Sequence, residues 1–304
     1  MPASFQHILL PIDFSEAGGN SLTTAIHLCK LHQAVLHLVH VVENNYFVTA
    51  PEPGIAISAI AEDIEKQADE KLQELYKQLI RSHPIVIKLH LPTGIPYEEI
   101  CRLASDIPAA LIVMGTHGAS GVKEFLMGTT AFSVIKHTAI PVLTIPAHFS
   151  EAVFTKILFP VRPVPGIEAK YRFVTTFLYQ QTADIHIAVL CLPGEEALLL
   201  QYKTELNEII EEAEHTQHSC TKAFGECKNF ATRVLEMGKE QVADLIVINA
   251  TLDYNWTQFF TGPYTQQVVN HSTIPVLSFR HTGGDAGDTS LEISHQPASQ
   301  KTQE

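Results

Sequence analysis

Positive charge, paired cysteines and long apolar runs are all scarce in this chain of 304 residues. Lys and Arg number 20 against 33 Asp and Glu, so the formal net charge is −13 and most of the surface would repel a nucleic acid duplex. Nucleic acid is therefore not expected as the main partner. The five cysteines are odd in number and include no Cys-x-x-Cys pair, which argues against a disulfide framework and favours reduced, buried thiols.

Membrane-spanning and secretory segments are also missing. No apolar stretch approaches the ~20 residues of a membrane helix, and the N-terminus lacks the basic start of a signal peptide. We therefore expect a cytoplasmic protein with no membrane span. Apolar residues make up 45% of the chain, as in ordinary globular proteins. Since a domain usually takes roughly 100–200 residues, the length favours two domains.

An internal repeat supports that division. Phe5–Asp13 (FQHILLPID) matches Phe154–Arg162 (FTKILFPVR) at an offset of 149 residues. Ile140–Leu143 matches Ile274–Leu277 at an offset of 134 residues, so the first copy is 15 residues longer, and we place the surplus in the loop from Asn44 to Ile55. The predicted domains are 1–147 and 151–281, followed by a tail, 282–304, whose polar composition predicts disorder.

Short apolar runs alternate with stripes of helical spacing in both copies. The runs are too continuously apolar for exposed strands, which is typical of parallel strands covered on both faces. Right-handed crossovers then predict an α/β fold, with two doubly wound parallel sheets of about five strands in tandem. In the first copy the expected strands are 8–12, 36–42, 86–91, 111–114 and 142–145, and a helical stripe runs from Ile57 to Leu79. In the second copy we expect a long acidic helix over 195–218, a helix carrying Phe230, Val234 and Met237, and a strand over 244–248.

The segment after the fourth expected strand has the features of a phosphate site. Val113–Gly121 reads as a strand followed by a glycine-rich loop, and a helix is expected to begin near Gly128. Glycines let the backbone approach a ligand closely, and unpaired N–H groups at a helix start attract an anion. The hydroxyls of Thr129 and Thr130 can donate to phosphate oxygens.

A second loop is expected beside the first. Pro11, Ile12 and Asp13 end the first strand, and ligands of parallel sheets bind beyond the carboxyl ends of strands where the strand order reverses. Asp13 could accept from a ribose or a base, or hold a divalent cation through the phosphates. An alternative is that Asp13 caps the following helix.

These residues resemble a known family. The spacing Gly115-x2-Gly118-x9-Gly128-Thr129 is similar to the G-x2-G-x9-G-[S/T] signature of ATP-binding universal stress proteins, and effectively all of residues 5–146 fit. The resemblance implies an adenine nucleotide alpha hydrolase-like, Rossmann-like fold that binds ATP with Mg²⁺. It implies an internal pseudo-dimer of the two repeats through their last strands, and leaves open whether whole chains form a homodimer.

The resemblance also implies binding positions, with backbone polar atoms near the base reading its edge. They are Pro11 at the end of the first strand, Ile12, Asp13 and Val41 around the adenine, Met114 and Gly115 near the ribose, and His117, Gly118, Gly128, Thr129 and Thr130 at the phosphates.

The second copy departs from this pattern at the decisive places. The replacements are Arg162 for Asp13, Asn249 for Gly115, Leu252 for Gly118, and Pro263 and Tyr264 for Thr129 and Thr130, while Gly262 is kept. Proline lacks the N–H group that a phosphate cradle needs. We therefore predict a degenerate second site that does not hold ATP in the family manner.

Three functions remain open on this evidence. The favoured one is a stress-response protein in which ATP binding regulates shape or partners, because there is no Walker A motif and no general base can be named. The second is a slow ATPase or phosphotransferase using Asp13 and His117. The third is a scaffold or carrier of an apolar ligand, with Tyr254, Trp256, Phe259 and Phe260 in the second copy.

Histidines outside the motif are interpreted as structural. His37, His40 and His186 lie on expected strands and are expected to be satisfied core or half-buried residues. His215, His218 and Cys220 lack a clear fourth metal ligand, and we interpret them as a solvated helix end. No metal ligand is predicted among them.

Overall fold

A computed structural model provides the coordinates of the protein. The residues it describes are 5–15, 18–43, 57–116, 128–161, 167–179, 181–194, 207, 211, 217–250 and 264–279. The expected loop 44–55, the tail 282–304 and most of the expected acidic helix 195–218 lie outside these residues, as do His117, Gly118 and the aromatic residues 254–260.

The first half of the chain alternates strands and helices as expected. Its elements are β1 (His7–Pro11), α1 (Gly19–His32), β2 (Val35–Val39), β3 (Val42–Glu43), α2 (Ile57–Ser82), β4 (Ile87–His90), β5 (Thr93–Gly94), α3 (Pro96–Asp106), β6 (Leu111–Gly115), α4 (Thr129–His137) and β7 (Val142–Ile145). The strands β4, β2, β1, β6 and β7 lie side by side in that order, all parallel. The order therefore reverses between β1 and β6.

The second half repeats this plan. Its elements are β8 (Lys156–Val161), α5 (Ile167–Leu178), β9 (Asp184–Cys191), β10 (Ser219–Glu226), α8 (Phe230–Glu240), β11 (Leu245–Asn249), α9 (Tyr264–His271) and β12 (Val276–Phe279). The parallel order is β10, β9, β8, β11 and β12, which reverses between β8 and β11. Both halves therefore contain the expected five-stranded, doubly wound sheet. The boundary that we predicted near residues 147–151 falls in the connection between β7 and β8.

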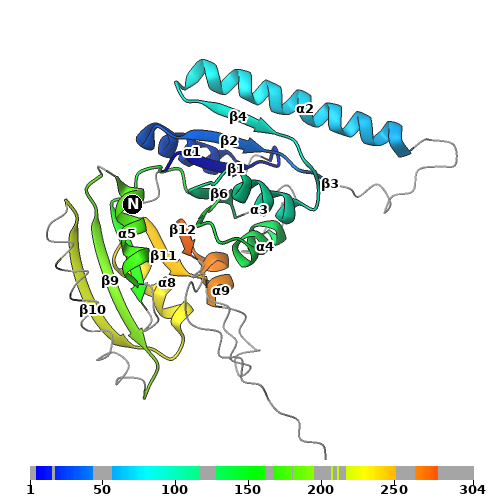
Figure 1. Cartoon of the computed structure of the whole chain (residues 1–304). Helices are drawn as coiled ribbons and strands as arrows, with labels where there is room; N and C mark the ends of the chain where they lie inside the picture. Colours follow the sequence, from blue (N-terminus) through cyan, green and yellow to red (C-terminus); the bar gives the residue numbers. More distant parts are fainter. Residues whose placement is uncertain are drawn as a thin grey trace, which may run out of the picture.

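The last strands of the two halves join them into one ten-stranded sheet (Figure 1). β7 and β12 pair antiparallel, with Leu143 opposite Leu277. Thr144 Oγ1 adds a bond by donating to the carbonyl of Val276 at 3.1 Å. This is the internal pairing of repeats that the family resemblance implied.

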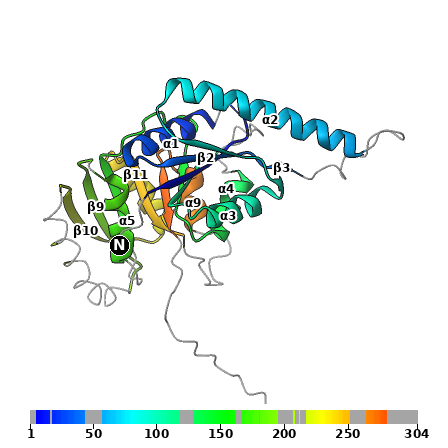
Figure 2. The same cartoon turned by 45° about the horizontal axis from the view of Figure 1, so that its top comes forward.

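Helices cover both faces of the sheet and divide the core into two layers. One layer lies under α1, α2 and α5, and the other under α3, α4, α8 and α9. Figure 2 shows α1 and α2 over one side of the first half, with α3 and α4 on the other. Between the halves, the ring of Phe5 packs on Phe173 and Phe177, and His32 Nε2 donates to the carbonyl of Phe177 at 3.0 Å.

One expected strand is divided in the structure. We predicted a single strand over 36–42, but β2 ends at Val39 and β3 begins at Val42. The backbone N–H of His40 still donates to the carbonyl of His90, whereas Val42 and Glu43 pair with β5 in a separate two-stranded sheet. The chain therefore leaves the main sheet after β2 and joins a second, two-stranded sheet.

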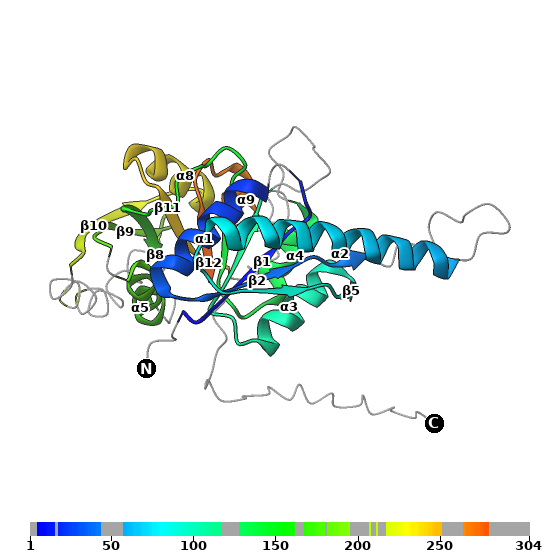
Figure 3. The ribbon, with the colours of Figure 1, turned by 90° about the horizontal axis from the view of Figure 1, so that it is seen from above.

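The long helix α2 reaches beyond the sheet that it covers. Seen from above in Figure 3, its N-terminal part extends past the strands. Leu72 and Leu79 of the expected stripe are buried, whereas Ile64 is 40% exposed. The apolar stripe is therefore only partly used as core. No helix among the described residues is both long enough and apolar enough to cross a membrane.

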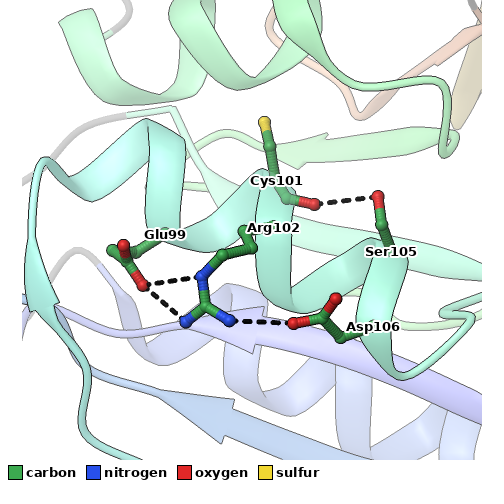
Figure 4. Close-up of polar contacts among 5 residues, drawn as sticks. All are labelled: Glu99, Cys101, Arg102, Ser105 and Asp106. Carbon is green, nitrogen blue, oxygen red and sulfur yellow. Dashed lines mark hydrogen bonds and ion pairs between the residues drawn. The ribbon is translucent and has the colours of Figure 1, made fainter.

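Helix α3 begins with Pro96 in its first turn, where a missing N–H costs nothing. On its exposed face, Arg102 pairs with Glu99 at 2.6 Å and with Asp106 at 2.8 Å (Figure 4). Exposed pairs of this kind contribute little to stability. We expect Arg102→Ala to leave the thermal midpoint nearly unchanged, as measured by circular dichroism.

The carboxylate of Asp244 ties the starts of β8 and β11 together. It accepts from the N–H and the hydroxyl of Thr155, at 2.8 and 2.9 Å, and from the N–H of Lys156 at 3.0 Å. Burial nevertheless raises its pKa above the ordinary range, against the opposing effect of these bonds. We expect Asp244→Ala to destabilise the fold by about 2 kcal/mol, because it removes the hydrogen bonds that a half-buried carboxylate accepts from Thr155 and Lys156. Chemical denaturation beside Arg102→Ala checks this, and equal midpoints for the two variants would contradict it.

Candidate functional site

A cavity lies at the carboxyl ends of β1, β2 and β6, where the strand order reverses. Its volume is about 560 Å³, within the usual range for a small-molecule site. The N-terminal ends of α1, α3 and α4 reach its wall through Gly19, Pro96 and Thr129. Because helix N-termini carry partial positive charge, this crevice suits an anionic ligand.

Nine of the eleven predicted binding residues line this one crevice. They are Pro11, Ile12, Asp13, Val41, Met114, Gly115, Gly128, Thr129 and Thr130. The other two, His117 and Gly118, lie outside the described residues. Residues from four segments far apart in the sequence therefore meet as the motif predicted.

Helix α4 begins at the crevice without a side-chain cap. Gly128 is the N-cap residue, and its own N–H donates to the carbonyl of Thr116 at 2.8 Å. The N–H groups of the first turn have no partner within a helix. Thr129 and Thr130 add hydroxyls on the same wall. This arrangement can receive a phosphate by hydrogen bonds and by the helix dipole together.

Asp13 does not cap α1, so the alternative that we considered for it is wrong. The N-cap residue of α1 is Gly18, which lies beyond Asp13 and has no side-chain cap. Asp13 Oδ1 instead accepts from the N–H of Ser15 at 3.0 Å and from its hydroxyl at 2.6 Å. This local turn presents a carboxylate at the crevice, where Glu43 also lies. Carboxylate oxygens suit a divalent cation such as Mg²⁺.

The crevice also contains residues that the motif did not reveal. The most informative is His40, whose Nδ1 donates to the carbonyl of Ile12 at 2.8 Å and whose ring packs against Phe14 at 4.6 Å between centroids. Phe14 itself has a left-handed backbone with φ of 56°. We interpreted His40 only as a structural histidine, because a histidine on an expected strand is usually a satisfied core or half-buried residue.

The equivalent place in the second half is filled by its own side chains. Lys170 and Tyr171 stand where Ser21 and Leu22 stand in the first half, at the offset of 149 residues. Lys170 is 5% exposed and Tyr171 is 0% exposed. Lys170 Nζ donates to the carbonyl of Pro160 at 3.2 Å, at the carboxyl end of β8, and lies 4.3 Å from the ring centroid of Phe159.

Burial lowers the pKa of Lys170 to about 7. No carboxylate pairs with this ammonium within the described part of the chain. The other sequence changes are placed as follows: Asn249 ends β11 and Tyr264 begins α9, while Arg162, Leu252, Gly262 and Pro263 lie outside the described residues.

The remaining histidines are mostly structural. His37 is buried between two others, with 3.1 Å from its Nε2 to His7 Nδ1 and 2.9 Å from its Nδ1 to His90 Nε2. Burial, followed by the neighbouring charges, lowers the pKa of His37 to about 4. His186 Nδ1 meets the hydroxyl of Thr221 at 2.9 Å, as expected of a satisfied half-buried residue, although its Nε2 has no partner.

The expectation of a solvated helix end around His218 is wrong. His218 is buried, with 7% of its surface exposed, and it precedes β10 rather than ending a helix. Burial lowers its pKa. Within the described ranges, no three His, Cys, Asp or Glu side chains gather as metal ligands would.

The fold and crevice define an α/β protein of the adenine nucleotide alpha hydrolase-like class, built twice in one chain. A universal stress protein from Archaeoglobus fulgidus has the same architecture, with a TM-score of 0.67 over 91% of this chain and 97% of that one, at 19% identity. The protein PA1789 of Pseudomonas aeruginosa gives a TM-score of 0.56 over 91% and 93% of the chains, at 14% identity. At these identities the likeness shows the fold alone.

Sequence comparison gives the family. The universal stress protein family model matches residues 4–146. A universal stress protein of Methanocaldococcus jannaschii is 30% identical over 141 residues, covering 46% of this chain and 82% of the relative. One from Synechocystis is 31% identical over 142 residues, covering 47% and 86%. The chain therefore belongs to the universal stress protein family.

Proposed function

We propose that the protein binds ATP, together with Mg²⁺, in the crevice of its N-terminal half. The observation that carries the proposal is the convergence of nine motif-derived residues on one crevice that contains the uncapped start of α4. In this arrangement the phosphates lie at Gly128, Thr129 and Thr130, and the adenine lies near Ile12 and Val41. Asp13 supplies a carboxylate oxygen to the cation.

We further propose that the second half binds no nucleotide in this manner. Lys170 and Tyr171 occupy the place that is open in the first half, and Pro263 lacks an N–H at the equivalent of the phosphate cradle. In this view domain 1–147 is the nucleotide-binding unit and domain 151–281 is its degenerate partner in a pseudo-dimer.

The role that we favour is regulatory binding rather than fast catalysis. The described crevice holds carboxylates at Asp13 and Glu43 but no arginine, whereas phosphoryl transfer relies on cationic groups that stabilise the developing charge. ATP occupancy would then act by altering the shape of the protein or its choice of partners. A slow hydrolytic activity remains the second candidate, with Asp13 as the ligand of Mg²⁺.

Calorimetric titration of the nucleotide-stripped protein with Mg-ATP tests the proposal, with mass spectrometry of any ligand that co-purifies. One ATP per chain is expected. Two per chain would contradict the degenerate second half. No binding, with an apolar molecule co-purifying instead, would favour the carrier function over nucleotide binding.

A further inference from the structure

Three histidines form a hydrogen-bonded row across β1, β2 and β4. His7 Nδ1 lies 3.1 Å from Nε2 of His37, and His37 Nδ1 lies 2.9 Å from Nε2 of His90. The planes of the His37 and His90 rings differ by 13°, with 5.1 Å between their centroids. His37 is 2% exposed, whereas His7 and His90 are half-buried. The central ring therefore meets a neighbouring ring nitrogen at each of its own two nitrogens.

The row lies on the face of the sheet that α3 covers. Residues two apart on a strand point to the same face, so His7 lies on the side of Leu9, and His37 on the side of Val39. Both apolar residues belong to the core layer under α3. The charged side chains of α3 are Glu98, Glu99, Arg102 and Asp106, and none of them is among the causes that shift the pKa of His37.

The groups that do act on His37 all carry or can take up positive charge. Burial is the largest cause that lowers its pKa, to about 4, and the charges of His90, His7 and Lys88 act in the same direction. Burial, followed by Lys88, also lowers the pKa of His90. No carboxylate of the described residues appears among these charges. The row therefore takes up protons without a counterion from this part of the chain.

Hydrogen bonding leaves room for only one added proton in the row. Each of the two contacts needs a single hydrogen, because one nitrogen must donate and the other accept. Three neutral rings carry one N–H each, so two of these hydrogens lie in the contacts and the third sits on an outer nitrogen. One added proton takes the other outer nitrogen, and both contacts survive. A second added proton has to enter a contact, where two N–H groups then face each other on two cationic rings.

The contact between His37 and His90 is the one expected to break. Among the described strands, β4 is outermost in its half and pairs with β2 alone, whereas β1 pairs with both β2 and β6. All residues of β4 are half-buried or exposed. A strand that is bonded on one side and little buried opens at a lower free energy than a central strand.

We propose that the row of His7, His37 and His90 is a proton-sensitive latch, which holds β4 on β2 until a second added proton breaks the contact between His37 and His90. The lowered pKa of His37 gives the direction, because the closed row binds protons less tightly than the open one. The pairing of β4 with β2 therefore weakens as the pH falls from 6.5 towards about 4. In this way the latch couples acidification to the opening of a sheet edge, whose backbone groups another strand can pair with.

Hydrogen exchange of the β4 amides in the full chain tests the proposal. The exchange is followed by mass spectrometry between about pH 7 and about pH 4 and corrected for the intrinsic exchange rate at each pH. We expect constant protection while the row holds at most one added proton. At lower pH the protection factor should fall by about tenfold per pH unit, because each opening takes up one proton.

Two variants with the same chemical change separate the latch from general acid unfolding. His90→Gln keeps a hydrogen-bonding group opposite His37, and its amide can turn to donate or to accept, so this contact no longer comes into conflict with an added proton. The acid response of β4 should disappear in this variant. His7→Gln also removes one ring but leaves the contact between His37 and His90, so β4 should still open in acid.

Nitrogen NMR of the unmodified protein, with isotope-labelled histidine, gives a readout that needs no variant. The three rings should gain one proton together while β4 stays protected, and the second as the protection is lost. Protection of β4 that stays constant down to about pH 4, or that falls equally in both variants, would overturn the proposal. Uptake of two protons by the row with β4 still protected would overturn it as well.

Discussion

Replacing Gly128 with aspartate is expected to abolish ATP binding without unfolding the protein. Gly128 is the N-cap residue of α4, and among the described residues a Cβ there would have only the carbonyl oxygen of Thr116 within 4 Å, at 3.9 Å. Aspartate is a favoured N-cap residue, so its carboxylate should accept from the first-turn N–H groups and preserve the helix.

The same carboxylate should exclude the phosphates. It would occupy the donors that the ligand needs and place a negative charge where the ligand carries its own. We expect the affinity to fall by at least about 100-fold, with a thermal midpoint that is unchanged or slightly raised. Calorimetry with Mg-ATP and a thermal melt of the same sample measure both quantities.

Three further variants test whether the charge, the bulk or the position of the new side chain causes the loss of ATP affinity. Gly128→Ala adds a methyl group that comes no closer than 3.9 Å to any described atom outside the neighbouring residues, and it should keep most of the affinity. Gly128→Asn caps the helix without charge and should give an intermediate loss. Gly262→Asp changes the equivalent position of the second half and should leave ATP binding nearly unchanged. Equal losses at Gly128 and Gly262 would contradict the asymmetry between the halves, and retained affinity in Gly128→Asp would remove the phosphates from α4.

Prediction from the sequence succeeded where apolar continuity or glycine spacing dictates structure. The strand over 142–145 was predicted at its observed bounds, because β7 is buried on both faces at the centre of the ten-stranded sheet. The outermost strand β10 gave little signal, since SCTKAFGE alternates exposed and half-buried residues. An edge strand needs no continuous apolar run, so polar sequence there does not exclude a strand.

The sequence analysis names candidate site residues only as far as the motif extends. Gly115, Gly128 and Thr129 carry a spacing that chemistry requires, and the described structure brings them to one crevice. His40 lies just after β2 and contacts Ile12 from another segment, and Phe14 has a left-handed backbone conformation. No local sequence pattern predicts such contacts between segments.

The burial of Lys170 was not predicted from the sequence. A lysine near the start of a helix is usually a solvated residue. Here the helix α5 packs its first turn against the carboxyl end of β8, so the side chain is 5% exposed and ends at the carbonyl of Pro160. Removing an ammonium from water without a carboxylate partner is costly.

Replacing Lys170 with methionine is therefore expected to stabilise the protein. Methionine has a similar length and no charge, so it should fill the same space. The pKa of Lys170 is lowered from 10.5 to about 7 by burial. A full shift of that size corresponds to roughly 5 kcal/mol. The bond to Pro160 and the ring of Phe159 offset part of the cost, so we expect a gain of about 3 kcal/mol at pH 7.

The lowered pKa of Lys170 also predicts how the stability of the protein changes with pH. Because the pKa is lowered in the folded state, the unfolded chain binds the proton more tightly between pH 7 and pH 10.5. The contribution of Lys170 to the free energy of unfolding therefore becomes less unfavourable as the pH rises from 7 to 10.5. Below about pH 7 this contribution no longer changes with pH. The advantage of Lys170→Met should shrink by about 3 kcal/mol between pH 7 and pH 10.

Denaturation by guanidinium at several pH values measures this difference. Ionisation of tyrosines and cysteines affects the variant and the unmodified protein alike, so it cancels when the two are subtracted. Lys156→Met is the control, because Lys156 is exposed at the start of β8 and its replacement should give no pH-dependent difference. A Lys170→Met protein that is less stable than the original at pH 7 would mean that the ammonium supports the fold through Pro160 and Phe159. The packing of α5 against the carboxyl end of β8 would then depend on that charge.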